Sequence, residues 1–305
     1  MSNVLQRLDE FLTKHHQVNR PLLIGYSGGP DSSALLHGFW KFKKKYSFDL
    51  AVVHIDHGWR QESAEEAEKL KDYVSGLGFT FILERLQSSF SSSNLEESAR
   101  LARMEVFSRY YIRLDAQALV LAHQAQDQAE TVLKRIFEGS HITALGAMRQ
   151  VSTYEGMNLW RPFLEIPKGE LIDYCNAFNI RYLVDKTNED TRFLRARMRK
   201  DLVPLLEEHF GKQIQGNLAR LSETVHEMAD YFADRLTPSS GDLSGMHPFE
   251  VKLALKQLAE RNSLTLGKKH IDQIYELLEK KDGVSRKFII GRKTVVICNG
   301  IINLC

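Results

Sequence analysis

Residues 22–33 read LLIGYSGGPDSS, an apolar run followed by two adjacent glycines, a proline, an acid and two hydroxyls. The run has the composition of a buried strand, and Pro30 suits the first turn of a helix, where its missing N–H does no harm. Glycine provides the backbone angles that a tight strand-to-helix turn requires. It also leaves bare N–H groups beside the positive end of the helix, where an anion such as phosphate binds. The segment therefore predicts a strand–turn–helix unit with an anion site at its turn.

Strand and helix patterns alternate through the first half of the chain. Apolar runs typical of strands occupy residues 22–26, 49–56, 79–86 and 118–123. Helical patterns follow these runs, at about 30–45, 63–78, 94–114 and 125–137. Strands separated by helices of this length form βαβ units. We therefore expect an α/β fold, with a Rossmann-like parallel sheet that carries helices on both faces.

The pattern changes to helices and loops after Arg161-Pro162. Residues 211–240 read as a linking helix and a polar break, and two further helical patterns follow. The chain ends in three short β-branched runs with Gly291-Arg292 and Asn299-Gly300 as turns, and Asn-Gly is a strong hairpin signal. The sequence therefore predicts a large α/β domain over 1–210, a linking segment over 211–240 and a smaller α+β domain over 241–305.

Composition excludes several classes of protein. Hydrophobic residues make up 43% and charged residues 26% of the 305 residues, which is typical of a globular protein. No apolar stretch approaches the ~20 residues that cross a bilayer, so no membrane partner is expected. Cys175, Cys298 and Cys305 include no Cys-x-x-Cys pair, which argues against a disulfide framework and a cysteine zinc site. These features favour a cytoplasmic location.

The glycine turn resembles a known nucleotide-binding signature. It is not a Walker loop, and it does not match the Gly-x-Gly-x-x-Gly pattern of dinucleotide sites. A turn used only for its geometry would not explain the acid and hydroxyls at the helix start. Residues 27–32, SGGPDS, resemble the SGGxDS signature of the PP-loop, or N-type, ATP pyrophosphatases. That resemblance implies ATP as cofactor, its pyrophosphate end held by the turn, and Mg²⁺ beside Asp31.

Four further motifs narrow the resemblance. They are HIDHGWR at 54–60, NLEESARLAR at 94–103, AHQAQDQAET at 122–131 and DKTN at 185–188, the last followed by an arginine cluster. In this order and spacing they are similar to the tRNA(Ile)-lysidine synthetases, over about residues 20–205. The resemblance implies ATP-dependent ligation of free lysine to the wobble cytidine of an isoleucine tRNA with a CAU anticodon. An adenylated C2 intermediate, AMP and pyrophosphate are implied as well.

The resemblance also assigns roles to individual residues. Those implied in catalysis are Asp31, His123, Asp127, Glu130, Arg103 and Arg195. Those implied in nucleotide binding are Ser27, Gly28, Gly29, Pro30, Asp31, Ser32, His54, Asp56 and His57. Those implied in RNA binding are Arg100, Arg192, Arg197, Arg199 and Lys200. Asp31 and Asp127 are implied in transient Mg²⁺ binding, the domain over 1–210 in catalysis, and that over 241–305 in contacting tRNA.

The residues around His123 make chemical sense by themselves. His123, Asp127 and Glu130 are spaced i, i+4 and i+7, so a helix that starts at the strand end would carry all three on one face. There they would bind Mg²⁺, orient an amine or accept its proton, and the sequence does not say which of them is the base. A solvated helix end with ordinary acids is the plainer reading. A permanent zinc site from His54, His57, His123 and Asp127 lacks dense ligand spacing.

Other readings remain open for the basic residues and for the function. Arg100 and Arg103 would also form surface ion pairs with Glu96 and Glu97, and the arginine cluster would also suit a solvated helix face. The β-branched runs at the end of the chain also carry cations. These would either add to the RNA-binding surface or keep an edge strand soluble, and they are Arg286, Lys287, Arg292 and Lys293.

Gln124, Gln126 and Ala196 depart from the family pattern near the site. The alternative functions are a PP-loop ATPase that modifies another nucleobase or a small metabolite, and a catalytically silent RNA-binding module. The sequence leaves open the lysine pocket, the discrimination between isoleucine and methionine tRNAs, and the oligomeric state, for which a homodimer is one possibility.

Overall fold

The computed structural model describes residues 2–56, 63–86, 95–183, 193–211, 213–235, 243, 246–261, 266–280, 282–290, 293–298 and 301–304. The chain forms two compact units. The first comprises Met1–Leu133 with Met148–Ala219, and the second Lys134–Ala147 with Arg220–Cys305. The chain therefore passes between the units within helix α5 (Ala125–Phe137), between Ala147 and Met148, and within helix α9 (Ile214–Arg235).

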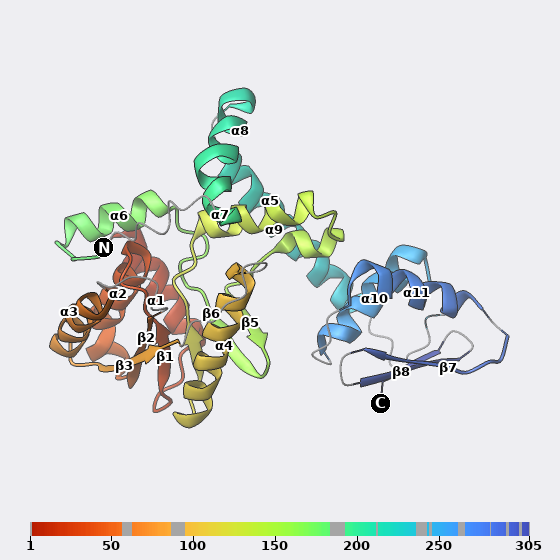
Figure 1. Cartoon of the computed structure of the whole chain (residues 1–305), viewed down its shortest axis with the longest axis horizontal. Coiled ribbons are helices and arrows are strands. Elements are labelled where there is room, and N and C mark those ends of the chain that lie inside the picture. Colours follow the sequence, from red (N-terminus) through yellow and green to blue (C-terminus); the bar gives the residue numbers. More distant parts are fainter. Residues whose placement is uncertain are drawn as a thin grey trace. The chain divides into compact units, whose positions relative to one another are not determined.

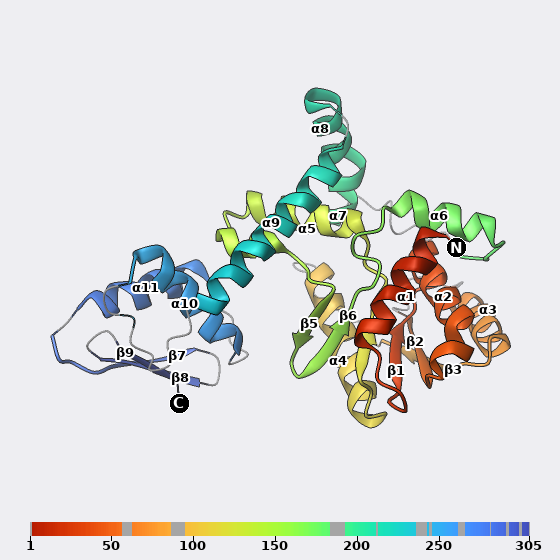
Figure 2. The same cartoon turned by 180° about the vertical axis from the view of Figure 1, so that it is seen from behind.

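The first unit is built on a sheet with helices packed around it (Figures 1 and 2). The sheet has six strands in the order β3-β2-β1-β4-β6-β5. Its strands are β1 (Leu22–Gly25), β2 (Leu50–Asp56), β3 (Thr80–Arg85), β4 (Ala118–Val120), β5 (Val151–Tyr154) and β6 (Met157–Trp160). Neighbouring strands are parallel except β5, which is antiparallel to β6. This confirms the expected Rossmann-like sheet.

The β5–β6 hairpin was not expected from the sequence. Its strands are four residues each, too short for a periodic pattern to stand out. The loop between them is Glu155-Gly156, with φ values of 47° and 83°. Positive φ at both central residues is the mark of a tight two-residue hairpin turn.

The helices lie where periodicity places them. In the first unit they are α1 (Asn3–His15), α2 (Pro30–Tyr46), α3 (Ser63–Gly76), α4 (Leu95–Arg113), α6 (Lys168–Ala177), α7 (Leu194–Arg197), the π-helical turn η3 (Met198–Leu202) and α8 (Val203–Phe210). Helices α5 and α9 belong partly to this unit. None of the helices in the described part of the chain combines the length and apolar character that crossing a bilayer demands.

Alternate residues of the central strands face two separate cores. Leu22 and Ile24 of β1 pack in a core with residues of α1, α2, α3 and α6. Leu23 points to the opposite face and packs with Val106 and Phe107 of α4. Because side chains alternate along a strand, helices on both faces bury every position of β1. The predicted two-sided packing is thereby confirmed.

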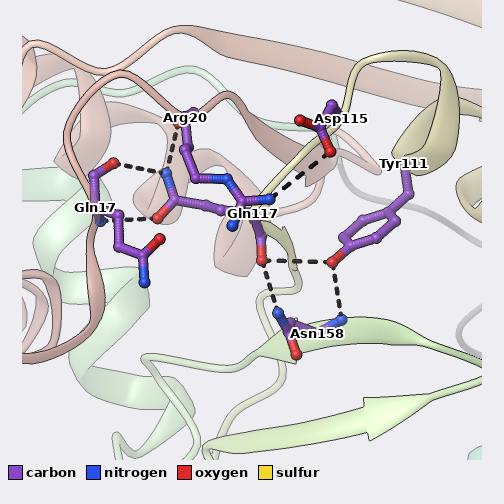
Figure 3. A network of polar contacts seen from close by, with 6 residues as sticks. All are labelled: Gln17, Arg20, Tyr111, Asp115, Gln117 and Asn158. Carbon is purple, nitrogen blue, oxygen red and sulfur yellow. Dashed lines mark hydrogen bonds and ion pairs between the residues drawn. The ribbon is translucent and has the colours of Figure 1, made fainter.

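A buried amide fixes the amino-terminal edge of the sheet. Gln117, 3% exposed, immediately precedes β4. Its Nε2 donates to Gln17 O at 3.0 Å and Arg20 O at 2.5 Å, and its Oε1 accepts from Gln17 N at 2.9 Å (Figure 3). Asn158 of β6 donates to the carbonyl of Gln117 at 3.0 Å. One side chain thus holds the α1–β1 connection against β4, with every polar group paired.

The second unit combines helices with a small sheet, and it covers more of the chain than the predicted domain over 241–305. Its helices are η1 (Ile142–Gly146), α10 (Pro248–Arg261) and α11 (Lys268–Glu279), with parts of α5 and α9. Strands β7 (Arg286–Ile290), β8 (Lys293–Cys298) and β9 (Ile301–Leu304) form an antiparallel sheet in that order. A core that includes Leu255, Ile274 and Val295 joins the two helices to the sheet. The expected turn residues 291–292 and 299–300 lie outside the described residues.

The two glycines of the β1–α2 turn serve different purposes. Gly28 has a φ of +81°, and a Cβ there would lie 2.9 Å from Leu70 Cδ2 and 3.1 Å from Leu183 Cδ1. Gly29 is the helix N-cap with φ −71° and ψ 170°, which other residues adopt. A Cβ on Gly29 would have Ser27 Oγ as its nearest neighbour, at 3.5 Å. The turn's geometry therefore requires glycine at position 28, and the fold leaves space at 29.

This difference is testable by unfolding. We expect Gly28→Ala to lower the free energy of unfolding by at least about 1–2 kcal/mol, because left-handed backbone alone costs that much and Leu70 must also move. Gly29→Ala, the matched control, should stay close to the wild type. Denaturant unfolding followed by circular dichroism measures both. Equal destabilisation by the two substitutions would contradict the assignment.

Candidate active site at the carboxyl edge of the sheet

Polar residues follow four adjacent strands where the parallel sheet ends. Ser27 follows β1, Asp56 closes β2, His123 follows β4 and Arg161 follows β6. Carboxyl ends of parallel strands share one edge, and ligands of open α/β sheets bind there. The edge is therefore the candidate site.

The glycine turn is shaped by its own hydroxyls. Ser27 Oγ accepts from Gly29 N at 3.3 Å and lies 3.1 Å from Ser32 Oγ, which donates to Gly29 O at 3.1 Å. Ser33 Oγ donates to Gly28 O at 3.3 Å. Among the described residues no side chain caps the first turn of α2. The N–H groups at the positive end of α2 are thus available to an anion, and the phosphate site stays a prediction.

Asp31 stands in the first turn of α2 with an unsatisfied carboxylate. Its Oδ1 is buried and accepts no hydrogen bond from any described residue. Burial raises the pKa of Asp31 to about 6, and the nearby Asp127 carboxylate adds to the rise. Lys168 and Arg199 act in the opposite direction on this pKa. Two carboxylates that repel each other, one with a spare oxygen, suit a hard cation such as Mg²⁺.

The zinc alternative gains no support. In the described ranges no cluster of three or more His, Cys, Asp or Glu side chains is arranged to hold a metal ion. His57, one of its four candidate ligands, lies outside the described residues.

One geometric expectation is wrong. Helix α5 begins at Ala125, so His123 is not on a helical face with Asp127 and Glu130. The helix starts only at Ala125 for a local reason. Asp127 Oδ2 accepts from Gln124 N at 3.0 Å, and Gln124 Oε1 accepts from Gln126 N at 2.6 Å. These side-chain caps hold the chain out of helical geometry until Ala125. His123 therefore comes from the strand end and the two acids from the helix.

His123 is a neutral imidazole near pH 7. Burial lowers its pKa to about 4, against the opposing effect of Asp127. Arg161, Arg195 and Arg103 lower the pKa further. Its Nδ1 is enclosed and has no hydrogen-bond partner in the described part of the chain. A neutral ring with a free nitrogen can position a substrate by a hydrogen bond.

Glu130 is a buried acid poised near neutrality. It is 2% exposed, and neither carboxylate oxygen has a hydrogen bond to a described residue. Burial raises its pKa to about 7, Arg199 opposes this rise and Asp127 reinforces it. Arg199 Nε lies 3.5 Å from Glu130 Oε1. A pKa near the working pH is what proton transfer requires.

His54 and Asp56, which the resemblance implies in nucleotide binding, have structural partners. His54 Nδ1 donates to Tyr26 O at 2.9 Å, which links the ends of β2 and β1 and fixes the imidazole tautomer. Burial lowers the pKa of His54. Asp56 is 7% exposed, and its Oδ2 lies 3.7 Å from Arg85 Nε. His54 thus has the capping role that lone strand-end histidines often have.

The basic residues are divided between the site and the surface. Arg195 of α7 and Arg199 of η3 are half-buried and act on His123 and Glu130, whereas Arg197 and Lys200 are exposed. Arg100 donates to both oxygens of Glu97, at 2.7 and 2.9 Å, which is the surface pairing that the sequence left open. Arg192 lies outside the described residues.

Two cations of the site were not foreseen. Lys168 at the start of α6 acts on the pKa of Asp31 and of Glu130. Arg161 follows β6 and acts on His123. If β6 had been recognised in the sequence, Arg161 would have stood at the end of a parallel strand, and that position would have indicated a site residue. Nothing in the local sequence distinguishes Lys168 from a surface lysine.

Comparisons with known proteins identify the family of the chain. Residues 1–206 match the PP-loop domain family. A tRNA(Ile)-lysidine synthase of Chlamydia pneumoniae is 36% identical, with 93% of this chain and 92% of that protein covered. Its counterpart in Protochlamydia amoebophila is 31% identical, with 98% and 68% covered.

The fold also has a solved counterpart. A U34-tRNA thiolase from Methanococcus maripaludis, solved with its [4Fe-4S] cluster, superposes with a TM-score of 0.60 at 16% identity, over 73% of this chain and 78% of the thiolase. At this identity the likeness concerns the fold alone. The stronger evidence is the sequence identity to the Chlamydia pneumoniae protein, which extends over nearly the whole length of both chains. By this identity the chain belongs to the tRNA(Ile)-lysidine synthase family of PP-loop proteins.

Proposed function

We propose that this protein is an ATP-dependent ligase that joins lysine to the wobble cytidine of an isoleucine tRNA with a CAU anticodon. The observation that carries the proposal is the set of desolvated ionisable groups, Asp31, His123 and Glu130, beside an uncapped glycine turn. The names of the family members support the substrate class. An anticodon loop is a suitable target, because its bases are unpaired and can enter a pocket.

In the first step, the cytosine O2 attacks the α-phosphorus of ATP and pyrophosphate leaves. The turn at 27–32 would hold the departing phosphates through its N–H groups and the end of α2. Asp31 and Asp127 would hold Mg²⁺, which when bound offsets phosphate charge. The step replaces a poor leaving group at C2, the carbonyl oxygen, with adenylate, which leaves readily. It therefore prepares C2 for substitution.

In the second step, the ε-amine of lysine attacks C2, a C–N bond forms and the C–O bond to AMP breaks. The amine must lose its proton to attack, and we assign this proton to Glu130, whose pKa of about 7 matches the task. Neutral His123 would orient the pyrimidine or the amine through its free nitrogen. Arg103 and Arg195, which act on His123, would stabilise the negative charge on the departing AMP.

RNA contacts complete the proposal. Arg197 and Lys200, which are exposed, would meet phosphates of the anticodon arm together with Arg192. The small domain over 241–305 would add contacts, although Arg286 of β7 is already paired with Asp282. Binding should weaken as salt rises, since phosphate contacts release counterions.

The direct test uses ATP, labelled lysine and two transcripts that share the CAU triplet. We expect label on the isoleucine tRNA and none on the methionine tRNA, with one AMP formed per lysine attached. Scintillation counting of precipitated RNA measures the transfer. Label on both RNAs, or on neither, would overturn the proposed activity.

Asp31 provides a residue-level test. Asp31→Ala should reduce pyrophosphate release by at least ~100-fold, because it removes a group that acts on the phosphates, and should leave tRNA affinity within about threefold. Asp72→Ala, at an exposed position on α3, is the control for loss of an acid. Pyrophosphate release and filter binding measure the two effects. Retained turnover would refute the role of Asp31.

Glu130 predicts a dependence of stability on pH. Its raised pKa means that the folded protein favours the protonated acid, so stability is lost as pH rises from about 4.5 through 7. Glu130→Gln removes this penalty. At pH 8 the variant should be more stable by on the order of 1–2 kcal/mol, after allowance for the lost Arg199 contact, and the gap should close toward pH 5.

Thermal unfolding at the two pH values measures this gap. Glu105→Gln, at an exposed position on α4, controls for removal of a surface carboxylate. A variant that is less stable at pH 8, or a gap that does not change with pH, would show that the acid is not desolvated as described.

A further inference from the structure

Arg161 is a buried guanidinium whose Nε and Nη2 donors have no acceptor among the described residues. The residue is 8% exposed. Its Nη1 donates to Arg149 O at 3.0 Å and to Ser152 Oγ at 2.9 Å, and its backbone N donates to Gln150 O at 2.7 Å. Both side-chain bonds come from Nη1, and Nε is buried without an acceptor among the described residues. The hairpin thus fixes the guanidinium plane and leaves the Nε–Nη2 edge without an acceptor among the described residues.

The charge of Arg161 is also uncompensated. Burial lowers its pKa to about 10, and no acid of the described chain opposes this shift. The group therefore stays cationic at neutral pH. A buried charge without a partner is strongly destabilising, and structures retain such groups where a ligand supplies the counter-charge.

Strand pairing places this cation in the site. Val120 of β4 pairs with Trp160 of β6, and Leu121 N donates to Trp160 O at 2.8 Å. Arg161 therefore lies beside the residues that lead to His123, whose pKa it lowers. Charges of both signs meet in the site. Arg161, Arg195 and Arg103 act together on the pKa of His123. Asp31, Asp127 and Glu130 are the acids, and Lys168 and Arg199 act on the pKa of Asp31 and of Glu130.

We propose that the Nε–Nη2 edge of Arg161 binds an oxyanion of the reaction, either the α-carboxylate of lysine or the phosphate of the adenylate. Two parallel N–H donors match the two oxygens of either group. With the carboxylate, the lysine chain would run from Arg161 to its ε-amine at Glu130. With the phosphate, Arg161 would hold AMP as it leaves. The inference rests on the proposed function and adds a subsite to it.

The test compares two amines. Lysine and cadaverine share the reacting amine, and cadaverine lacks the carboxylate. We measure kcat/KM for both, and inhibition by AMP, in the wild type, Arg161→Gln and Arg161→Lys. Arg20→Gln, an exposed arginine paired loosely with Asp115 at 3.8 Å, is the matched control and should behave as the wild type.

Each oxyanion has its own signature. If Arg161 binds the carboxylate, Arg161→Gln lowers kcat/KM for lysine at least ~10-fold and leaves cadaverine within about threefold, so the preference for lysine collapses. If it binds the phosphate, both amines fall together and the inhibition constant of AMP rises at least ~10-fold. Arg161→Lys keeps the positive charge but loses the two parallel N–H donors. It should therefore change the same constants as Arg161→Gln, by a smaller factor.

Two results would overturn the inference. An equal fall for both amines with unchanged inhibition by AMP would show that Arg161 only anchors the hairpin, and constants within threefold of the wild type would show no role. Circular dichroism confirms that each variant is folded, and if Arg161→Gln is not, Arg161→Lys decides. If the wild type forms no product with lysine and none with cadaverine, the proposed function is refuted instead. Calorimetric titration of AMP then still decides whether Arg161 binds phosphate.

Discussion

The removal of charged side chains from water at one edge of a parallel sheet is the constraint on which this site depends. Burial is the main cause of the pKa shifts of Asp31, His123, Glu130 and Arg161. Each shift is also a penalty on folding, because the charged form is disfavoured where the chain places it. The groups are held there by a sheet that is packed on both faces, and their unfavourable environment is what prepares them for chemistry.

The glycine turn and the buried charges are complementary parts of one arrangement. The turn offers N–H groups and the end of α2, which suit anions. The acids beside it suit cations, and a nucleotide with its metal ion carries both. The two-sided core and the Gln117 amide hold the strands in register from the opposite edge. Rigid placement of the strand ends is therefore what makes the spacing of the site reproducible.

The sequence was informative wherever a pattern was local and long. Helices such as α2 and the strands β1 and β2 follow from periodicity, and the glycine turn follows from backbone chemistry. The short hairpin β5–β6 lacked such a pattern. The position of His123 depended on helix caps made by Gln124 and Asp127, which compete with a helical spacing rule. The state of Arg161 depended on strand pairing, and no local signal carries that information.

The hairpin that anchors Arg161 is the edge of the sheet, and this has a dynamic consequence. Fraying of β5 would break the bonds that Arg161 donates to Arg149 O, Gln150 O and Ser152 Oγ, and it would admit water to the guanidinium. If an oxyanion binds only when β5 is paired, the fraction of molecules with a frayed β5 falls as more of the site is occupied. Amide hydrogen exchange of β5, at the edge of the sheet, would then report whether an oxyanion is bound at Arg161.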